Sequence, residues 1–125
     1  MQQRPTAAEL LADISSLLTE VVDIVPDAVR HRVRVAANLS GIVERELRLG
    51  PEAAEAERVR LASLFDAAGT TDLASLRTQL VDRLNAPEPL TPTESAAIYD
   101  VLLAAVRDDL AISKPGYEQW TREET

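Results

Sequence analysis

The chain has 125 residues, a net charge of −8 and no cysteine. These values predict one domain, residues 1–125, without disulfides, thiolate metal sites or thiol catalysis. An acidic chain is a poor general ligand for nucleic acid, because phosphate contacts need clustered Lys and Arg. No run of about 18 apolar residues is present, and residues 1–10 lack a signal-peptide pattern, so we expect a cytoplasmic protein outside any membrane.

Two helices are predicted in the first fifty residues. Thr6 and Glu9 have capping-box spacing, which predicts a helix that runs to about Ile24. Pro26 interrupts helical backbone at the residue before it and separates this helix from a second one. Gly50 suits the left-handed position that ends a helix, so the second helix is predicted over 26–50.

Three further helices are predicted after that glycine. Pro51 suits the first turn of a third helix, predicted over 51–65. Four leucines with helical spacing predict a fourth helix over 72–85, with its apolar stripe at Leu73, Leu76, Leu80 and Leu84. Thr91 and Glu94 form a capping box around Pro92, which predicts a fifth helix to about Ile112. The tail 117–125, a candidate flexible segment, holds Tyr117 and Trp120 and docks either into the bundle or onto a partner.

The segment Asp27–Leu49 is the predicted centre of the fold. At 100° per residue, Val33, Val43 and Leu47 fall on one side, and Val35 and Leu39 on another. A helix that is apolar on two sides is usually surrounded by other helices. We therefore expect an all-α, compact bundle of about five helices around this central buried helix.

One polar stripe on the same segment is chemically distinctive. Arg34, Asn38, Gly41, Arg45 and Arg48 follow at spacings of 4, 3, 4 and 3, with His31 at the edge of the row. The stripe either forms structural ion pairs with acidic neighbours such as Asp100 or Asp108, or binds an anion. For the second case the candidate ligand-binding residues are Arg34, Asn38, Arg45 and His31. Gly41 in mid-helix costs about 1 kcal/mol relative to Ala, which calls for close packing or an approaching ligand.

The sequence contains no recognisable catalytic set. His31 is the only histidine, and no nucleophile motif or phosphate-binding loop accompanies it. Glu44 and Glu46 diverge on a helix, so they do not form a metal pair with neighbouring ligands. We therefore expect no catalytic residue, metal or cofactor. The sequence does not decide whether the protein is an enzyme, but it favours a non-enzymatic protein.

Two stretches carry a family resemblance. Residues 32–39, RVRVAANL, with 42–47, IVEREL, resemble the RVAAN…IVxREL signature of a small, all-helical bacterial family of unknown function. The ending LAISKPGY resembles that family's LAIxNPxY close, although Ser113 and Lys114 stand where the family more often has Ala-Asn. Members are typically encoded beside aminoglycoside-phosphotransferase-like kinases and acyl-CoA dehydrogenases. The resemblance implies an accessory role. It also implies that any polar site shared by the family would include Arg34, Asn38, Arg45 and Glu46. Of these, Glu46 would be a structural polar residue.

Two functional hypotheses follow. The first is a non-enzymatic accessory protein that binds a phosphotransferase-like kinase or an acyl-CoA dehydrogenase as partner, and that could also form a homodimer. The alternative is a small-molecule binding protein that holds an anionic, CoA-like or acyl-like ligand over Arg34, Asn38 and Arg45.

Overall fold

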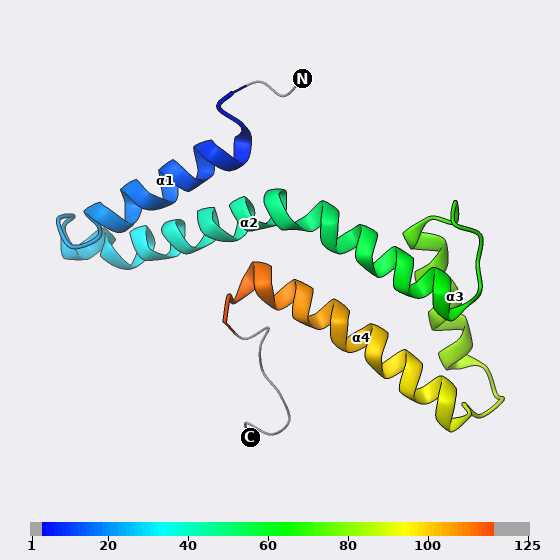
Figure 1. Ribbon diagram of the computed structural model, residues 1–125. Coiled ribbons are helices and arrows are strands. Elements are labelled where there is room, and N and C mark those ends of the chain that lie inside the picture. The colour runs from blue at the N-terminus through cyan, green and yellow to red at the C-terminus, as the bar shows by residue number, and fades with distance from the viewer. Residues whose placement is uncertain (1–3, 117–125) are drawn as a thin grey trace. The chain divides into compact units, whose positions relative to one another are not determined.

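The computed structural model describes residues 4–116, which form four α-helices (Figure 1). The helices are α1 (Ala7–Val21), α2 (Asp27–Leu64), α3 (Leu73–Asn85) and α4 (Pro92–Ser113). Residues 4–116 contain no β-strand, so the predicted all-α class is confirmed there. None of the helices in this range is both long and apolar enough to cross a bilayer. The predictions for the tail 117–125, including Tyr117 and Trp120, lie outside the described residues.

The prediction of about five helices is wrong for the described range, because the second and third predicted helices are one helix. α2 continues through Gly50 and Pro51 to Leu64. Gly50 therefore does not adopt the left-handed conformation that ends helices. A proline within a helix removes one backbone hydrogen bond and commonly kinks the axis. The expected helix boundary is instead a local weak point within α2.

The chain divides at this same point into two compact units, residues 1–50 and residues 51–125. The first, here called the hairpin unit, contains α1 and the first part of α2. The second, here called the core unit, contains residues 51–64 of α2 together with α3 and α4. Each unit is described by itself below. A single domain over residues 1–125 stays a prediction.

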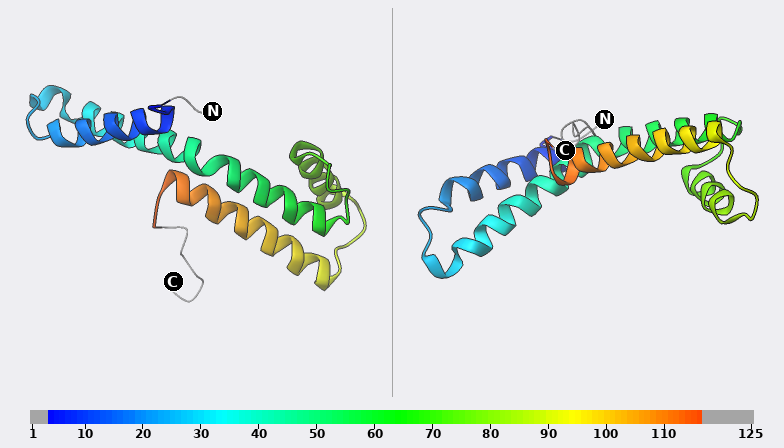
Figure 2. Two further views of the ribbon diagram at one scale, coloured as in Figure 1. Left: turned by 45° about the horizontal axis from the view of Figure 1, so that its top comes forward. Right: turned by 90° about the horizontal axis from the view of Figure 1, so that it is seen from below.

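The hairpin unit consists of two neighbouring antiparallel helices, α1 and residues 27–50 of α2 (Figures 1 and 2). Thr6 caps α1 by accepting a hydrogen bond from the Glu9 backbone N–H at 3.1 Å, as its capping-box spacing predicted. The turn between the helices is held by Arg30, which donates to the carbonyl oxygens of Val22 and Val25 at 3.0 Å each. Arg30 also forms an ion pair with Asp27 at the start of α2. One arginine thus satisfies the carbonyl group of Val22, the C-cap of α1, and that of Val25 in the turn that follows.

The core unit holds all five of the buried side chains of residues 4–116. Leu61 of α2, Leu76 and Leu80 of α3 and Ile98 of α4 form one buried cluster. Leu76 is completely shielded from solvent. Thr91 and Glu94 form the predicted capping box at the start of α4, with Pro92 in its first turn. The leucine stripe of α3 is covered only in part, because Leu84 stays 47% exposed at the far end of the helix.

The prediction that Asp27–Leu49 is a central buried helix is wrong. No residue of this segment is buried, and the only buried residue of α2 is Leu61 in the core unit. Within its own unit the segment has one neighbour, α1, which covers one side. Val35 and Leu39 of the other predicted side remain exposed, and so do Val43 and Leu47 of the first side. The exposed row therefore contains residues from both of the apolar sides that the sequence predicts.

Candidate functional site

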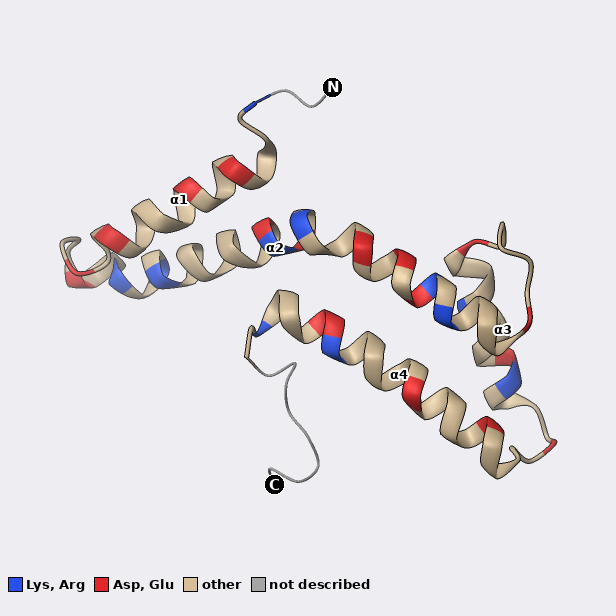
Figure 3. Ribbon diagram, viewed as in Figure 1, with Lys and Arg blue, Asp and Glu red and all other residues tan. Residues whose placement is uncertain are grey.

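Charge separates between the two helices of the hairpin unit (Figure 3). α1 carries three carboxylates, Glu9, Asp13 and Glu20, and no basic residue. Residues 27–50 of α2 carry five arginines against three carboxylates. The arginine-rich part of α2 therefore lies beside an acidic helix, α1.

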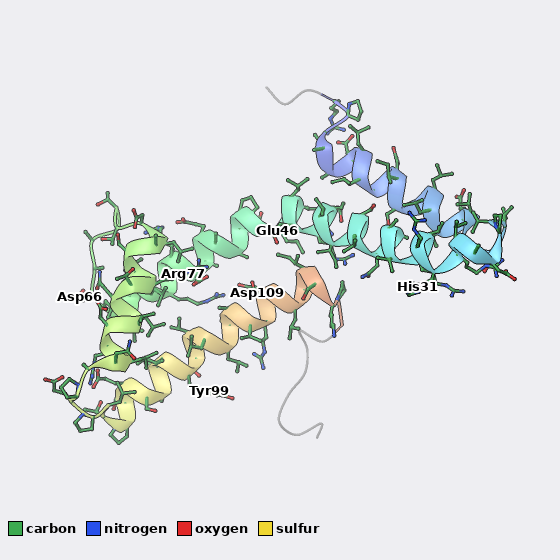
Figure 4. All side chains as sticks on the ribbon, turned by 180° about the vertical axis from the view of Figure 1, so that it is seen from behind. His31, Glu46, Asp66, Arg77, Tyr99 and Asp109 are labelled. Carbon is green, nitrogen blue, oxygen red and sulfur yellow. The ribbon has the colours of Figure 1, made fainter. Side chains whose placement is uncertain are left out.

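The candidate ligand-binding residues lie along the first part of α2. His31, Arg34 and Asn38 are exposed, and Arg45 is partly buried. His31 lies on the first part of α2, on the side away from α1 (Figure 4). Because these residues share one helix, their spacing brings them onto neighbouring turns but does not enclose them. Whether they bind a ligand stays a prediction.

The Arg45 side chain accounts for the glycine at position 41. A Cβ atom on Gly41 would lie 3.1 Å from Arg45 Nη1 and 3.7 Å from Ser15 Oγ of α1. Arg45 thus lies over the bare backbone one turn before it. Ser15 in turn donates a hydrogen bond to the Ala37 carbonyl oxygen at 3.1 Å, which ties α1 to α2. Arg45 and Ser15 therefore pack against the backbone at this glycine.

Glu46 also packs against a glycine one helical turn away, Gly50. Its carboxylate Oε1 lies 3.2 Å from the position that a Cβ on Gly50 would take. The side chain is exposed, and its carboxylate lies beside the glycine that precedes Pro51. The proposed structural role of Glu46 stays a prediction, and this position is consistent with it.

A cavity of about 570 Å³ lies where the start of α1 meets α2. It is lined by Thr6, Ala7, Ala8, Glu9, Ala12, Glu44, Leu47 and Arg48. Arg48 Nε donates to Glu44 Oε1 at 2.8 Å, and this hydrogen bond raises the pKa of Arg48. Arg48 is the member of the predicted stripe that borders this cavity. Sequence reasoning omitted it from the ligand-binding set, although its spacing of four from Glu44 indicates an ion pair on one face.

The charged side chains of the core unit join its helices. Arg77 of α3 donates two hydrogen bonds to Glu57 of α2, at 2.8 and 2.6 Å. This hydrogen bonding to Arg77 is the main cause that lowers the pKa of Glu57. Arg83 donates to both carboxylate oxygens of Glu94, at 2.9 and 3.0 Å. In each pair, a planar guanidinium donates two hydrogen bonds to a planar carboxylate, which holds both groups in one orientation. These pairs therefore fix the positions of the helices and do not indicate a catalytic group.

The core unit also contains a cavity and an ion pair between α2 and α4. A cavity of about 530 Å³ in the core unit is lined by Val59, Arg60, Ser63, Leu64, Ala97, Asp100, Val101 and Ala104. Asp108, one of the carboxylates considered for the polar stripe, lies 3.4 Å from Arg60 Nη1. Residues 4–116 contain no group of three or more His, Cys, Asp or Glu side chains placed to hold a metal ion.

Comparison with known proteins identifies a family and no function. Residues 23–117 match the family model described as a domain of unknown function, DUF6285. Neither the curated proteins nor the solved structures contain a significant match to this chain.

Proposed function

Because the chain belongs to the DUF6285 family, whose function is unknown, we propose from its surface that it is a non-enzymatic accessory protein. On this proposal it acts by binding another protein chain. One observation carries the proposal: the hairpin unit exposes a row of large apolar side chains on each of its helices. This surface, here called the hairpin face, consists of Leu10, Ile14 and Leu17 of α1 with Val35, Leu39, Val43 and Leu47 of α2.

The size of the hairpin face supports a role in protein association. Its seven side chains are between 41% and 58% exposed. Together they expose an area on the order of 600 Å², which reaches the upper end of the largest apolar patch found on typical monomers. Single exposed leucines need no explanation, but a contiguous surface of this size usually marks a binding site.

The family resemblance supports the choice of partner. Members of the family that the sequence resembles are encoded beside phosphotransferase-like kinases and acyl-CoA dehydrogenases. A phosphotransferase-like kinase is therefore the partner that we propose to test first. Genomic association supplies no chemistry of its own, and the proposal therefore depends on a direct binding measurement.

The experiment is a pull-down of the neighbouring kinase with the purified full chain at about 10 µM, a concentration that detects micromolar affinity. We expect wild-type protein to retain the kinase and Leu39→Glu to lose most of it. Val81→Glu is the matched control, because Val81 of α3 and Leu39 are both 54% exposed. Absence of capture by wild-type protein, for the kinase and the dehydrogenase alike, would contradict the proposal.

A second candidate is binding of an anionic small molecule by Arg34, Asn38 and Arg45. The exposure of Arg34 and Asn38 favours it, since a ligand can reach both side chains from solvent. Calorimetric titration with CoA and with a fatty acid tests this function. Arg34→Ala combined with Asn38→Ala is expected to abolish the heat signal, whereas Arg107→Ala, an exposed arginine on α4, is expected to leave it unchanged. Titrations without heat for either ligand would count against this candidate.

A further inference from the structure

We propose that the hairpin face is covered by a second copy of this chain. In the complex, α1 of each copy lies on residues 27–50 of α2 of the other copy, so that two hairpin units form a four-helix arrangement. This inference rests on the proposed function, protein association, and names a second copy as the occupant of the surface when no other partner is bound. A kinase that binds the hairpin face would compete with this second copy. Four arguments carry it: the geometry of the face, the lack of a core in the hairpin unit, charge and area.

The exposed rows of the two helices lie on the same face of the hairpin. On α1, the row Leu10, Ile14 and Leu17 lies about 120° from the side that faces α2, which includes Ser15. On α2, the row from Val35 to Leu47 lies about 110° from the side that includes Ala37, in the same rotational sense. Because the helices run in opposite directions, equal rotations bring both rows to one side. The result is a single apolar surface that a flat partner can cover.

The hairpin unit lacks a core of its own. Neither α1 nor residues 27–50 of α2 contains a buried residue. Two helices alone bury too little apolar surface to offset the entropy of ordering the chain. Adding a second hairpin gives four helices around a shared apolar centre, the arrangement of a four-helix bundle.

Charge selects between the two symmetric ways of stacking the hairpins. A two-fold axis across the helices would place α1 on α1, so that the acidic helices of both copies would face each other. A two-fold axis along the helices places α1 on the basic part of α2 instead. The second arrangement pairs helices of opposite net charge at both contacts, and neighbouring helices are antiparallel throughout.

The contact between Ser15 and Ala37 fixes which residues meet. This hydrogen bond sets the level of α1 along α2. Glu20 lies five residues after Ser15, and Arg32 lies five residues before Ala37, so both lie at one level. A two-fold axis along the helices keeps that level. Glu20 of one copy therefore faces Arg32 of the partner subunit at the edge of the interface, twice in the dimer.

The area is sufficient for association in solution. The hairpin face supplies on the order of 600 Å² of apolar surface per copy, and flanking polar atoms bring the total close to the roughly 800 Å² per partner of a standard interface. Because area alone does not set affinity, we expect a moderate dissociation constant on the order of 1–10 µM.

The first experiment is sedimentation analysis of the full chain between about 0.5 and 100 µM, which brackets the expected dissociation constant. We expect a reversible monomer–dimer equilibrium that Leu39→Glu and Val43→Glu each weaken by about 100-fold, because a charge would enter the apolar interface. Val81→Glu is expected to dimerise like wild type. Circular dichroism of each variant verifies that the helices are intact, and Leu39→Ala provides a milder variant should a glutamate unfold the hairpin.

The second experiment is a charge exchange that tests the arrangement. Glu20→Arg and Arg32→Glu are each expected to weaken dimerisation by about tenfold, since each acts at two symmetric contacts. The double variant restores opposite charges and is expected to recover the affinity of wild type. Unfolding cannot restore the dimerisation affinity of the double variant. The double variant therefore tests the arrangement even when the single variants are destabilised.

The outcomes separate this inference from the proposed function. A wild-type chain that is monomeric at about 100 µM, a concentration well above the expected dissociation constant, would overturn the inference. If that monomer still captures the kinase, the proposed function stands and the hairpin face belongs to a heterologous partner. A dimer that neither Leu39→Glu nor Val43→Glu weakens would overturn the choice of surface. A double variant that fails to recover would overturn the stacking of α1 on α2.

Discussion

At position 41, a glycine in the middle of α2 makes room for the guanidinium of Arg45. Glycine normally costs a helix about 1 kcal/mol relative to alanine. The sequence alone leaves two explanations for accepting this cost, a bound ligand or close packing. The distances from a Cβ at this position to Arg45 and Ser15 support packing. The guanidinium is the far end of a flexible side chain, so it can yield by a few tenths of an ångström.

We therefore predict that Gly41→Ala raises the free energy of unfolding by about 0.5–1 kcal/mol, because the gain in helix propensity exceeds the cost of moving Arg45. Urea unfolding followed by circular dichroism measures the change. In the Arg45→Ala background the same substitution is expected to gain at least as much, since the neighbouring group is gone. A loss of stability in both backgrounds would indicate that position 41 must remain a glycine for another reason.

Glu94 links the capping of α4 to the position of α3. Its carboxylate accepts from Arg83 and from the Thr91 backbone N–H. These hydrogen bonds, that from Arg83 first, lower the pKa of Glu94 from 4.5 to about 2. A carboxyl with a depressed pKa in the folded state stabilises the protein fully above its unfolded pKa. This contribution is lost as the pH falls from about 4.5 through about 2.

We predict that the free energy of unfolding decreases between these two pH values and that Glu94→Gln makes the decrease shallower. The glutamine cannot be protonated, so the variant is less stable at neutral pH but loses less on acidification. Thermal unfolding at a series of pH values measures both slopes. Glu52→Gln, an exposed glutamate of α2, is the control and should keep the slope of wild type. Equal slopes for Glu94→Gln and wild type would show that Glu94 does not cause the decrease.

At the scale of elements, the junction at Gly50 and Pro51 distinguishes the predicted fold from the observed one. Gly followed by Pro is typical of one helix ending and the next beginning. The same pair also occurs within continuous helices, where proline costs about 3 kcal/mol relative to alanine. Local sequence cannot separate these cases, because neither residue forces the chain out of helical backbone at position 50. The continuous α2 is therefore a result of the tertiary structure.

The substitution Pro51→Ala tests this difference directly. In a continuous helix it restores a hydrogen bond to residue 47 and removes a steric conflict, so we predict a gain of about 1–3 kcal/mol in unfolding free energy. At the first position of a separate helix, the same change would be neutral or slightly destabilising. Chemical denaturation decides between these outcomes, and Pro92→Ala at the start of α4 is the matched control for a true first-turn proline.

At the scale of the whole molecule, the core lies elsewhere than the sequence indicates. The segment with the widest apolar surface, 27–49, has no buried residue, whereas the shorter leucine stripe of α3 contributes Leu76 and Leu80 to the buried cluster. Residues 51–64 of α2 and α4 cover that stripe from two sides. Burial depends on how many neighbours an apolar face has, and a sequence pattern does not report its neighbours.

Leucine-to-alanine substitutions in α3 test the position of the core. We predict that Leu76→Ala lowers the free energy of unfolding by about 2–5 kcal/mol, because its side chain is fully enclosed. Leu84→Ala, on the same stripe but about half exposed, is expected to cost under about 1 kcal/mol. Chemical denaturation measures both variants. Similar losses for the two leucines would contradict the observed packing of α3.

The sequence by itself determined the helical class, the caps at Thr6 and Thr91, and the apolar sides of each helix, because these depend on the order and spacing of nearby residues. It also identified an arginine-rich stripe on α2, whose role as a site is still a prediction. Only the tertiary structure decided that α2 passes through Pro51, that Arg45 lies over Gly41, and that the core forms around Leu76. The core around Leu76 joins residues distant in sequence, and helical periodicity marks an apolar surface without specifying what covers it.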